Sequence, residues 1–248
     1  MMVSLKGHRA LVTGSTRGIG KAIAIRLARA GADIGVMGHQ SSGEPVAEEI
    51  RSLGVKSISV RADVAESLQV KRAIAEVNEA IGTIDILVNN AAVSDYQYRS
   101  GWELQEQAWD RMCDVNLKGV YLCCAHTIPS MIKGGWGRII NISSTSGING
   151  GTSGIHYAAT KGGVIALSKA LALEVSRYGI TVNVVAPSKI DTDMFRQMNP
   201  GERRKKTIER IPVGRLGRPE DIAEAVAYFT GENTGYTTAQ VLVVSGGY

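Results

Sequence analysis

The chain has few cysteines, few aromatic residues and no long hydrophobic run. Its three cysteines, Cys113, Cys123 and Cys124, form no CxxC pair and are a poor basis for a disulfide framework. We therefore expect a reducing compartment, the cytoplasm. No stretch approaches the roughly 18 apolar residues of a membrane span. The first residues lack the charged region and apolar run of a signal peptide. We therefore expect neither a membrane span nor a signal peptide.

An excess of one charge sign is also missing. Lysine and arginine number 28 and aspartate and glutamate 23, which gives a net charge of +5 that is mixed along the chain. This balance does not predict a nucleic-acid partner. The four histidines, His8, His39, His126 and His156, lack zinc-site spacing, so no metal is expected. Glycine is abundant, with 29 residues.

Short apolar runs alternate with longer amphipathic segments. The pattern predicts helices over residues 19–31, 44–53, 70–82 and 157–177, and strands over 10–13, 34–37, 57–60, 84–88, 138–142, 181–186 and 240–244. This alternation is typical of the α/β class, with about seven parallel strands and helices on both faces. We expect one doubly wound domain over residues 1–248, with one insertion at 193–206 that is rich in arginine and lysine.

A glycine-rich turn directly follows the first predicted strand and precedes a helix. Glycines let a pyrophosphate approach the backbone, and a helix N-terminus offers free N–H groups to it. The GxxxGxG spacing therefore predicts a dinucleotide-binding turn, and the alternative is a turn without a ligand. Its residues are Gly14, Ser15, Thr16, Arg17, Gly18, Ile19 and Gly20.

Four further motifs follow in order, and with the glycine turn they resemble the short-chain dehydrogenase/reductase family over essentially the whole chain. They are Asp63-Val64, Asn89-Asn90-Ala91-Ala92, the YxxxK segment from Tyr157 to Lys161, and Pro187 to Thr192. The resemblance implies a Rossmann-type fold and an NAD(P)-dependent oxidoreductase of CH–OH groups. Such an enzyme interconverts a secondary alcohol and a ketone by hydride transfer.

Tyr157 and Lys161 are four residues apart on a predicted helix and therefore share a face. A nearby ammonium favours the phenolate, so we expect Lys161 to lower the pKa of Tyr157, the general acid or base. The resemblance selects Ser144 to bind the substrate oxygen and implies that Asn116 holds a water in a proton relay. The alternatives are an exposed Tyr–Lys pair and a helix asparagine that only packs.

The second predicted strand ends at Gly38, where an aspartate would select NAD by binding a ribose hydroxyl. Because His39 and Arg17 suit a 2′-phosphate, we expect NADP, with NAD as the alternative. The resemblance implies further cofactor contacts. Asp63 and Val64 contact the adenine, Lys161 the ribose, and Ile190 and Thr192 the carboxamide. Asn90 and Ala91, which follow the fourth strand, and Tyr157 also contact the cofactor. Ala92 and Ser188 replace glycines of the family motifs.

The substrate wall is expected from residues 94–98 and 145–152 and from a lid near 193–210 that carries Met194, Phe195 and Met198. Its hydroxyls and amides favour a small polar ketone, sugar or polyol. The run from Arg203 to Lys206 either steers an anionic substrate or is a solvated helix.

Residues 212–220 resemble 3-oxoacyl-[acyl-carrier-protein] reductases, which are the alternative. Those reductases bind the acyl carrier protein with two arginines, and the corresponding positions of this chain hold Gly135 and Tyr178. We therefore rank this subtype lower. A non-catalytic dinucleotide-binding redox sensor is the alternative of another class. The resemblance also implies a homotetramer.

Overall fold

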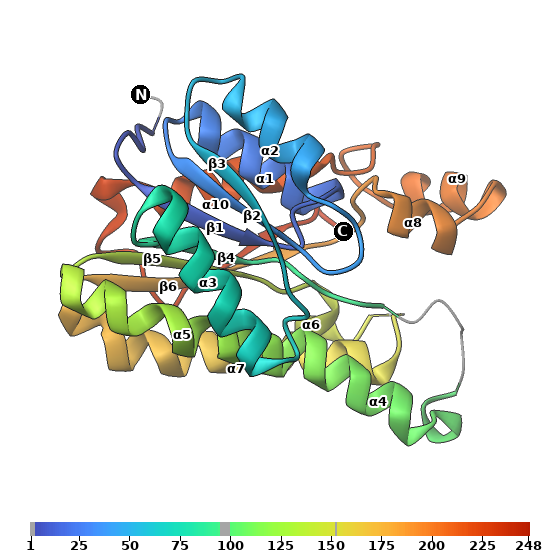
Figure 1. The fold of residues 1–248 in the computed structure, drawn as a ribbon. Helices are drawn as coiled ribbons and strands as arrows, with labels where there is room; N and C mark the ends of the chain where they lie inside the picture. Colours follow the sequence, from blue (N-terminus) through green and yellow to red (C-terminus); the bar gives the residue numbers. More distant parts are fainter. Residues whose placement is uncertain (1–2, 95–99, 152) are drawn as a thin grey trace.

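The computed structural model describes residues 3–94, 100–151 and 153–248. Its centre is one sheet of seven parallel strands in the order β3-β2-β1-β4-β5-β6-β7 (Figure 1). This confirms the predicted fold class. The strands are β1 (Arg9–Thr13), β2 (Asp33–Gly38), β3 (Ser57–Arg61), β4 (Ile86–Asn89), β5 (Gly137–Ile142), β6 (Ile180–Pro187) and β7 (Val241–Val244).

Helices cover both faces of the sheet and create two apolar cores. One core lies under α1 (Gly18–Arg29), α2 (Glu44–Arg51) and α10 (Pro219–Thr230). The other lies under α3 (Ser67–Ile81), α5 (Gly119–Gly134) and α7 (Ile155–Val175). Successive strand residues point to opposite faces, so Ile139 enters one core and its neighbour Ile140 the other. The central strands are therefore apolar without interruption.

Two predicted boundaries move for identifiable reasons. The fourth strand begins at Ile86 rather than Ile84, because the Ile84 N–H donates to Asn78 Oδ1 of α3 at 3.0 Å and is held in the preceding turn. Helix α7 begins at Ile155 and ends at Val175, where the 3-10 turn η3 (Ser176–Tyr178) takes over.

The remaining elements lie mostly beyond the carboxyl ends of the strands. They are η1 (Gly101–Glu103), α4 (Glu106–Cys113), the π-helical turn η2 (Asp114–Lys118), α6 (Ser146–Asn149), α8 (Asp193–Met198), α9 (Glu202–Glu209) and η4 (Glu232–Thr234). Helices α8 and α9 project from the body of the molecule (Figure 1). The strand order reverses between β1 and β4, which places a crevice at their carboxyl ends. Among the described residues, no helix is long and apolar enough to cross a membrane.

Candidate active site

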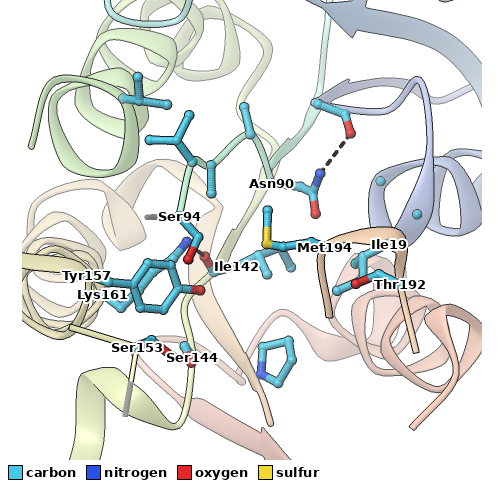
Figure 2. A pocket seen from close by; sticks show the side chains of 18 of the residues that line it. Ile19, Asn90, Ser94, Ile142, Ser144, Ser153, Tyr157, Lys161, Thr192 and Met194 are labelled. Carbon is cyan, nitrogen blue, oxygen red and sulfur yellow. Dashed lines mark hydrogen bonds between the residues drawn. The ribbon is translucent and has the colours of Figure 1, made fainter. Parts of the chain in front are cut away.

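A cavity of about 520 Å³ opens at the carboxyl ends of the strands. The glycine turn, the ends of β2 and β3, the segment after β5, the start of α7 and helix α8 all contribute to it. Tyr157, Lys161 and Ser144 lie on one side, with Thr192 and Met194 on another (Figure 2). The cavity therefore brings most of the predicted site residues together. Residues 95–98 and 152 of the predicted substrate wall, and the side chain of Met198, lie outside the described residues.

Lys161 is buried on α7, and its Nζ donates to the main-chain oxygen of Ile142 at 2.8 Å. Burial lowers the pKa of Lys161 to about 8. Its Nζ lies 5.7 Å from the centre of the Tyr157 ring. The two side chains share one helix face, as the four-residue spacing predicts.

The pKa of Tyr157 is shifted by burial and by Ser144. Burial raises this pKa, and the Ser144 hydroxyl beside the phenol lowers it, with a net increase above the ordinary value. The ammonium of Lys161 is held by the main-chain oxygen of Ile142 in β5 and is not among the causes of this shift. The expectation that Lys161 lowers the pKa of Tyr157 stays a prediction. In this geometry Ser144 is the group that stabilises the phenolate.

Asn116 lies in the π-helical turn η2 and has no exposed surface. Its Oδ1 accepts from the Val93 N–H at 2.8 Å, and its Nδ2 donates to the Val93 carbonyl at 2.9 Å. The side chain thus fixes the segment after β4 against η2, and it lies below the cavity rather than among its lining residues. The relay role that the resemblance implies stays a prediction.

The glycine turn lets a ligand approach its backbone closely. Gly14 and Gly18 have φ of +64° and +55°, and a Cβ on Gly20 would lie 2.5 Å from Asn90 Nδ2. Asn90 Nδ2 donates to the carbonyls of Thr13 and Gly14, both at 3.0 Å, which ties the turn to the end of β4. The N-terminus of α1 has no side-chain cap, so its N–H groups suit a pyrophosphate.

Ser15 has a structural position within the glycine turn. Its side chain is fully buried, and Oγ donates to the Val12 carbonyl at 2.7 Å while it accepts from the Met37 N–H at 3.1 Å. Its own N–H donates to the Met37 carbonyl at 3.1 Å. Ser15 therefore joins β1 to β2 and is not among the residues that line the cavity, and its assignment to the cofactor stays a prediction. The other six turn residues line the cavity.

The end of β2 leaves no room for a side chain at Gly38. A Cβ there would lie 2.5 Å from Thr16 Cγ2 and 2.8 Å from the Ser41 carbonyl. The same end of the cavity is lined by Arg17, His39, Asp63 and Val64. An acidic residue at position 38, as in the NAD-selecting pattern, would force this loop to shift.

Asp63 is paired with a residue that the sequence did not single out. Arg111 of α4 lies 3.0 Å from Asp63 Oδ2, and His39 Nε2 lies 3.7 Å from the same oxygen. Burial raises the pKa of Asp63, but the Ala65 N–H and Arg111 outweigh it, so the net pKa lies below the ordinary value. The carboxylate is ionised at neutral pH. No local pattern marks Arg111, which reaches the site from another part of the chain.

The segment after β6 has two roles. Ile190, Thr192 and Ser188 line the cavity. Thr192 also caps α8, because its Oγ1 accepts from the Phe195 N–H at 3.2 Å. Asp191, between the predicted carboxamide contacts, accepts from Arg196 Nε and Arg204 Nη2, both at 2.9 Å. One carboxylate thus holds α8 and α9, which the sequence analysis missed.

Gly135 and Tyr178, the positions used to rank the acyl-carrier-protein reductases lower, do not lie at the cavity in this fold. Gly135 precedes β5 and Tyr178 precedes β6, so both lie at the amino ends of strands. The cavity lies at the carboxyl ends, which are the opposite end of the parallel strands. These two positions therefore say nothing about the mouth of this cavity. Among the described residues, no cluster of histidine, cysteine, aspartate and glutamate could hold a metal ion.

Comparison with known proteins agrees with this geometry. Residues 14–248 match the family described as enoyl-(acyl carrier protein) reductase. The chain is 41% identical, over 96% of each chain, to a 3-oxoacyl-[acyl-carrier-protein] reductase of Staphylococcus aureus, and 40% identical, over 100% of this chain and 99% of the relative, to one of Aquifex aeolicus.

Two solved structures show the same arrangement. A 3-oxoacyl-[acyl-carrier protein] reductase from Brucella melitensis superposes with a TM-score of 0.91 at 32% identity, covering 98% of this chain and 92% of the other. A putative 2-deoxy-D-gluconate 3-dehydrogenase from Agrobacterium tumefaciens, solved with NADP, gives 0.89 at 34% identity, covering 98% and 97%. The chain therefore belongs to the short-chain dehydrogenase/reductase family of oxidoreductases.

Proposed function

We propose that this protein is an NADP-preferring reductase that converts a 3-oxoacyl thioester to the 3-hydroxyacyl thioester. The observation that carries the proposal is the convergence of Tyr157, Ser144 and Lys161 on a cavity that begins at the uncapped N-terminus of α1 (Figure 2). The thioester ranks first because relatives at 40–41% identity over nearly the whole chain carry that name. This reverses the order drawn from the sequence.

When bound beside the glycine turn, the nicotinamide cofactor would supply the hydride for reduction of the substrate carbonyl. The carbonyl oxygen accepts a hydrogen bond from Ser144 and takes the proton of Tyr157. Because Ser144 lies beside the phenol and lowers its pKa, it stabilises both the developing alkoxide and the phenolate that remains. Lys161 would hold the cofactor ribose, and Asn116 positions Val93, which lines the cavity.

The residues at the adenosine end of the cavity favour NADP over NAD. Gly38 presents no carboxylate to repel a 2′-phosphate, and a side chain there would collide with Thr16. Arg17 and His39 line the same end, and arginine suits phosphate. Asp63, which lines that end as well, is paired with Arg111.

The test compares two substrates and two cofactors. Acetoacetyl-coenzyme A and a keto-sugar acid are offered with NADPH and then NADH, and the loss of nicotinamide absorbance is followed. The proposal expects fast NADPH oxidation with the thioester and at least tenfold slower oxidation with NADH. Faster turnover of the sugar acid would establish the second candidate, which the hydroxyls of Ser94 and Ser153 near Tyr157 favour (Figure 2). Cofactor binding with no turnover of either substrate would favour the redox sensor.

We also propose that the chain is one catalytic domain with a lid at 193–210 and that it assembles as a homotetramer in the cytoplasm. Exposed apolar side chains on α5 and α7, such as Tyr121 and Leu173, and on edge strand β7, such as Val243, offer two faces for burial. The three cysteines are free, as in a reducing compartment. Sedimentation equilibrium tests the assembly, and a monomer would contradict it.

A further inference from the structure

Helix α9 and the residue that follows it direct their arginines and lysines to more than one side. Arg204 is directed toward the body of the protein, where its Nη2 donates to Asp191 Oδ2 at 2.9 Å. Ile208, four residues later, packs against the buried Phe195 and Ile211. At 100° per residue, Arg203, Lys206 and Arg210 fall within about 60° of one another on the opposite side of the helix. We call these three residues the α9 stripe.

The stripe is unpaired, whereas its neighbours are not. Lys205 Nζ lies 2.7 Å from Glu202 Oε1, and Arg204 is bound to Asp191. Within the described part of the chain, no carboxylate pairs with the three side chains of the stripe, all of which are exposed. Three cations one turn apart repel one another weakly, so an anion beside them is stabilised.

The stripe leads into the cavity through Arg203, which is one of its lining residues. Five described lining residues are lysine or arginine and two are aspartate. Both aspartates are already engaged, Asp63 by Arg111 and Asp193 by Arg196. On the α9 side of the cavity, Arg203 is therefore a lining cation with no carboxylate partner among the described residues.

We propose that the α9 stripe binds the phosphate-bearing arm of the substrate. This inference rests on the proposed function, because it needs a thioester whose acyl end reacts at Tyr157 while the arm leaves along α9. The recognised chemistry is a phosphate ester at the outer end of a pantetheine arm. Either coenzyme A or phosphopantetheine alone presents that group, and a short thioester without phosphate does not.

The experiment uses the full chain and three acetoacetyl thioesters, those of coenzyme A, 4′-phosphopantetheine and N-acetylcysteamine. The variant R203Q/K206Q/R210Q is compared with wild type and with K205Q, a matched control whose lysine is paired with Glu202 on the same helix. We expect the triple variant to raise KM for 4′-phosphopantetheine thioester about tenfold, and for the neutral thioester about twofold at most. The tenfold rise shrinks as salt is added.

The outcomes separate this inference from the proposed function. An equal KM change for charged and neutral thioesters, or none for either, overturns the stripe as a phosphate site while the function stands. An effect confined to coenzyme A, absent with 4′-phosphopantetheine, also overturns it, because the nucleotide phosphates would then be responsible. If wild type reduces none of the three thioesters, the proposed function fails. Turnover of the neutral thioester by the triple variant shows that it is folded.

Discussion

The two sides of the cavity are built from different interactions. On the side of β5 and α7, the polar groups are buried and bound to main chain, as Lys161 is to Ile142 and Asn116 to Val93. On the side of α8 and α9, exposed arginines are gathered by one carboxylate, Asp191. Buried hydrogen bonds with unique partners hold atoms in one place, whereas exposed ion pairs are worth little and exchange easily. The first side suits proton transfer, and the second suits a segment that admits ligands.

Removing the phenol hydroxyl tests the buried side most severely. We expect Y157F to lower kcat about 1,000-fold, because general acid catalysis is lost, while cofactor affinity changes little. Steady-state kinetics and fluorescence titration with NADPH measure the two effects. Retained turnover would show that Tyr157 is not the proton donor, and loss of cofactor binding would show that it has a wider role in the site.

A carboxylate at the end of β2 tests the adenosine end. We expect G38D to raise KM for NADPH more than tenfold, because its side chain would meet Thr16 and repel the 2′-phosphate. KM for NADH should rise less. The matched control is G134A, where a Cβ meets nothing within 4 Å. An equal loss with both cofactors would mean that only the loop was displaced and would remove the argument for NADP.

Titration of Lys161 tests the cost of burying a charge. Its folded pKa of about 8 lies below the ordinary 10.5, so the unfolded chain binds more protons between these values. The contribution of Lys161 to the free energy of unfolding therefore rises with pH above about 8, by an amount on the order of 1 kcal/mol. Urea unfolding of wild type and K161M at pH 7 and pH 9.5 measures it. The expected result is a gain of wild type over the variant at the higher pH, and a constant difference would contradict it.

Loosening the lid should have the smallest effect. We expect D191N to raise KM about threefold while the midpoint of thermal unfolding moves little, because its ion pairs are partly exposed. E202Q, which loses only the exposed pair with Lys205, is the control and should change neither quantity. A large drop in thermal stability would show that Asp191 supports the core and would remove the contrast between the two sides.

The motifs that carry the site were readable because each combines local features. The glycine turn follows a strand and opens a helix, and Tyr157 and Lys161 are one helical turn apart. The buried position of Ser15 within that turn was not readable, because its hydrogen bonds to Val12 and Met37 depend on how β1 pairs with β2. The pairing of Arg111 with Asp63 and the ion pairs of Asp191 were missed for the same reason, because their partners come from other elements.

The amino-acid sequence by itself determined the order of strands and helices, the two-sided burial of the sheet and the edge at which the motifs gather. These follow from hydrophobic periodicity and from glycine positions, which act over a few residues. Only the tertiary structure decided which charges are neutralised and which stay free. It pairs Asp63 with Arg111 and Asp191 with Arg196 and Arg204, and among the described residues it leaves the α9 stripe without a carboxylate partner. Charge pairing depends on distances between elements, and those exist only when the chain is folded.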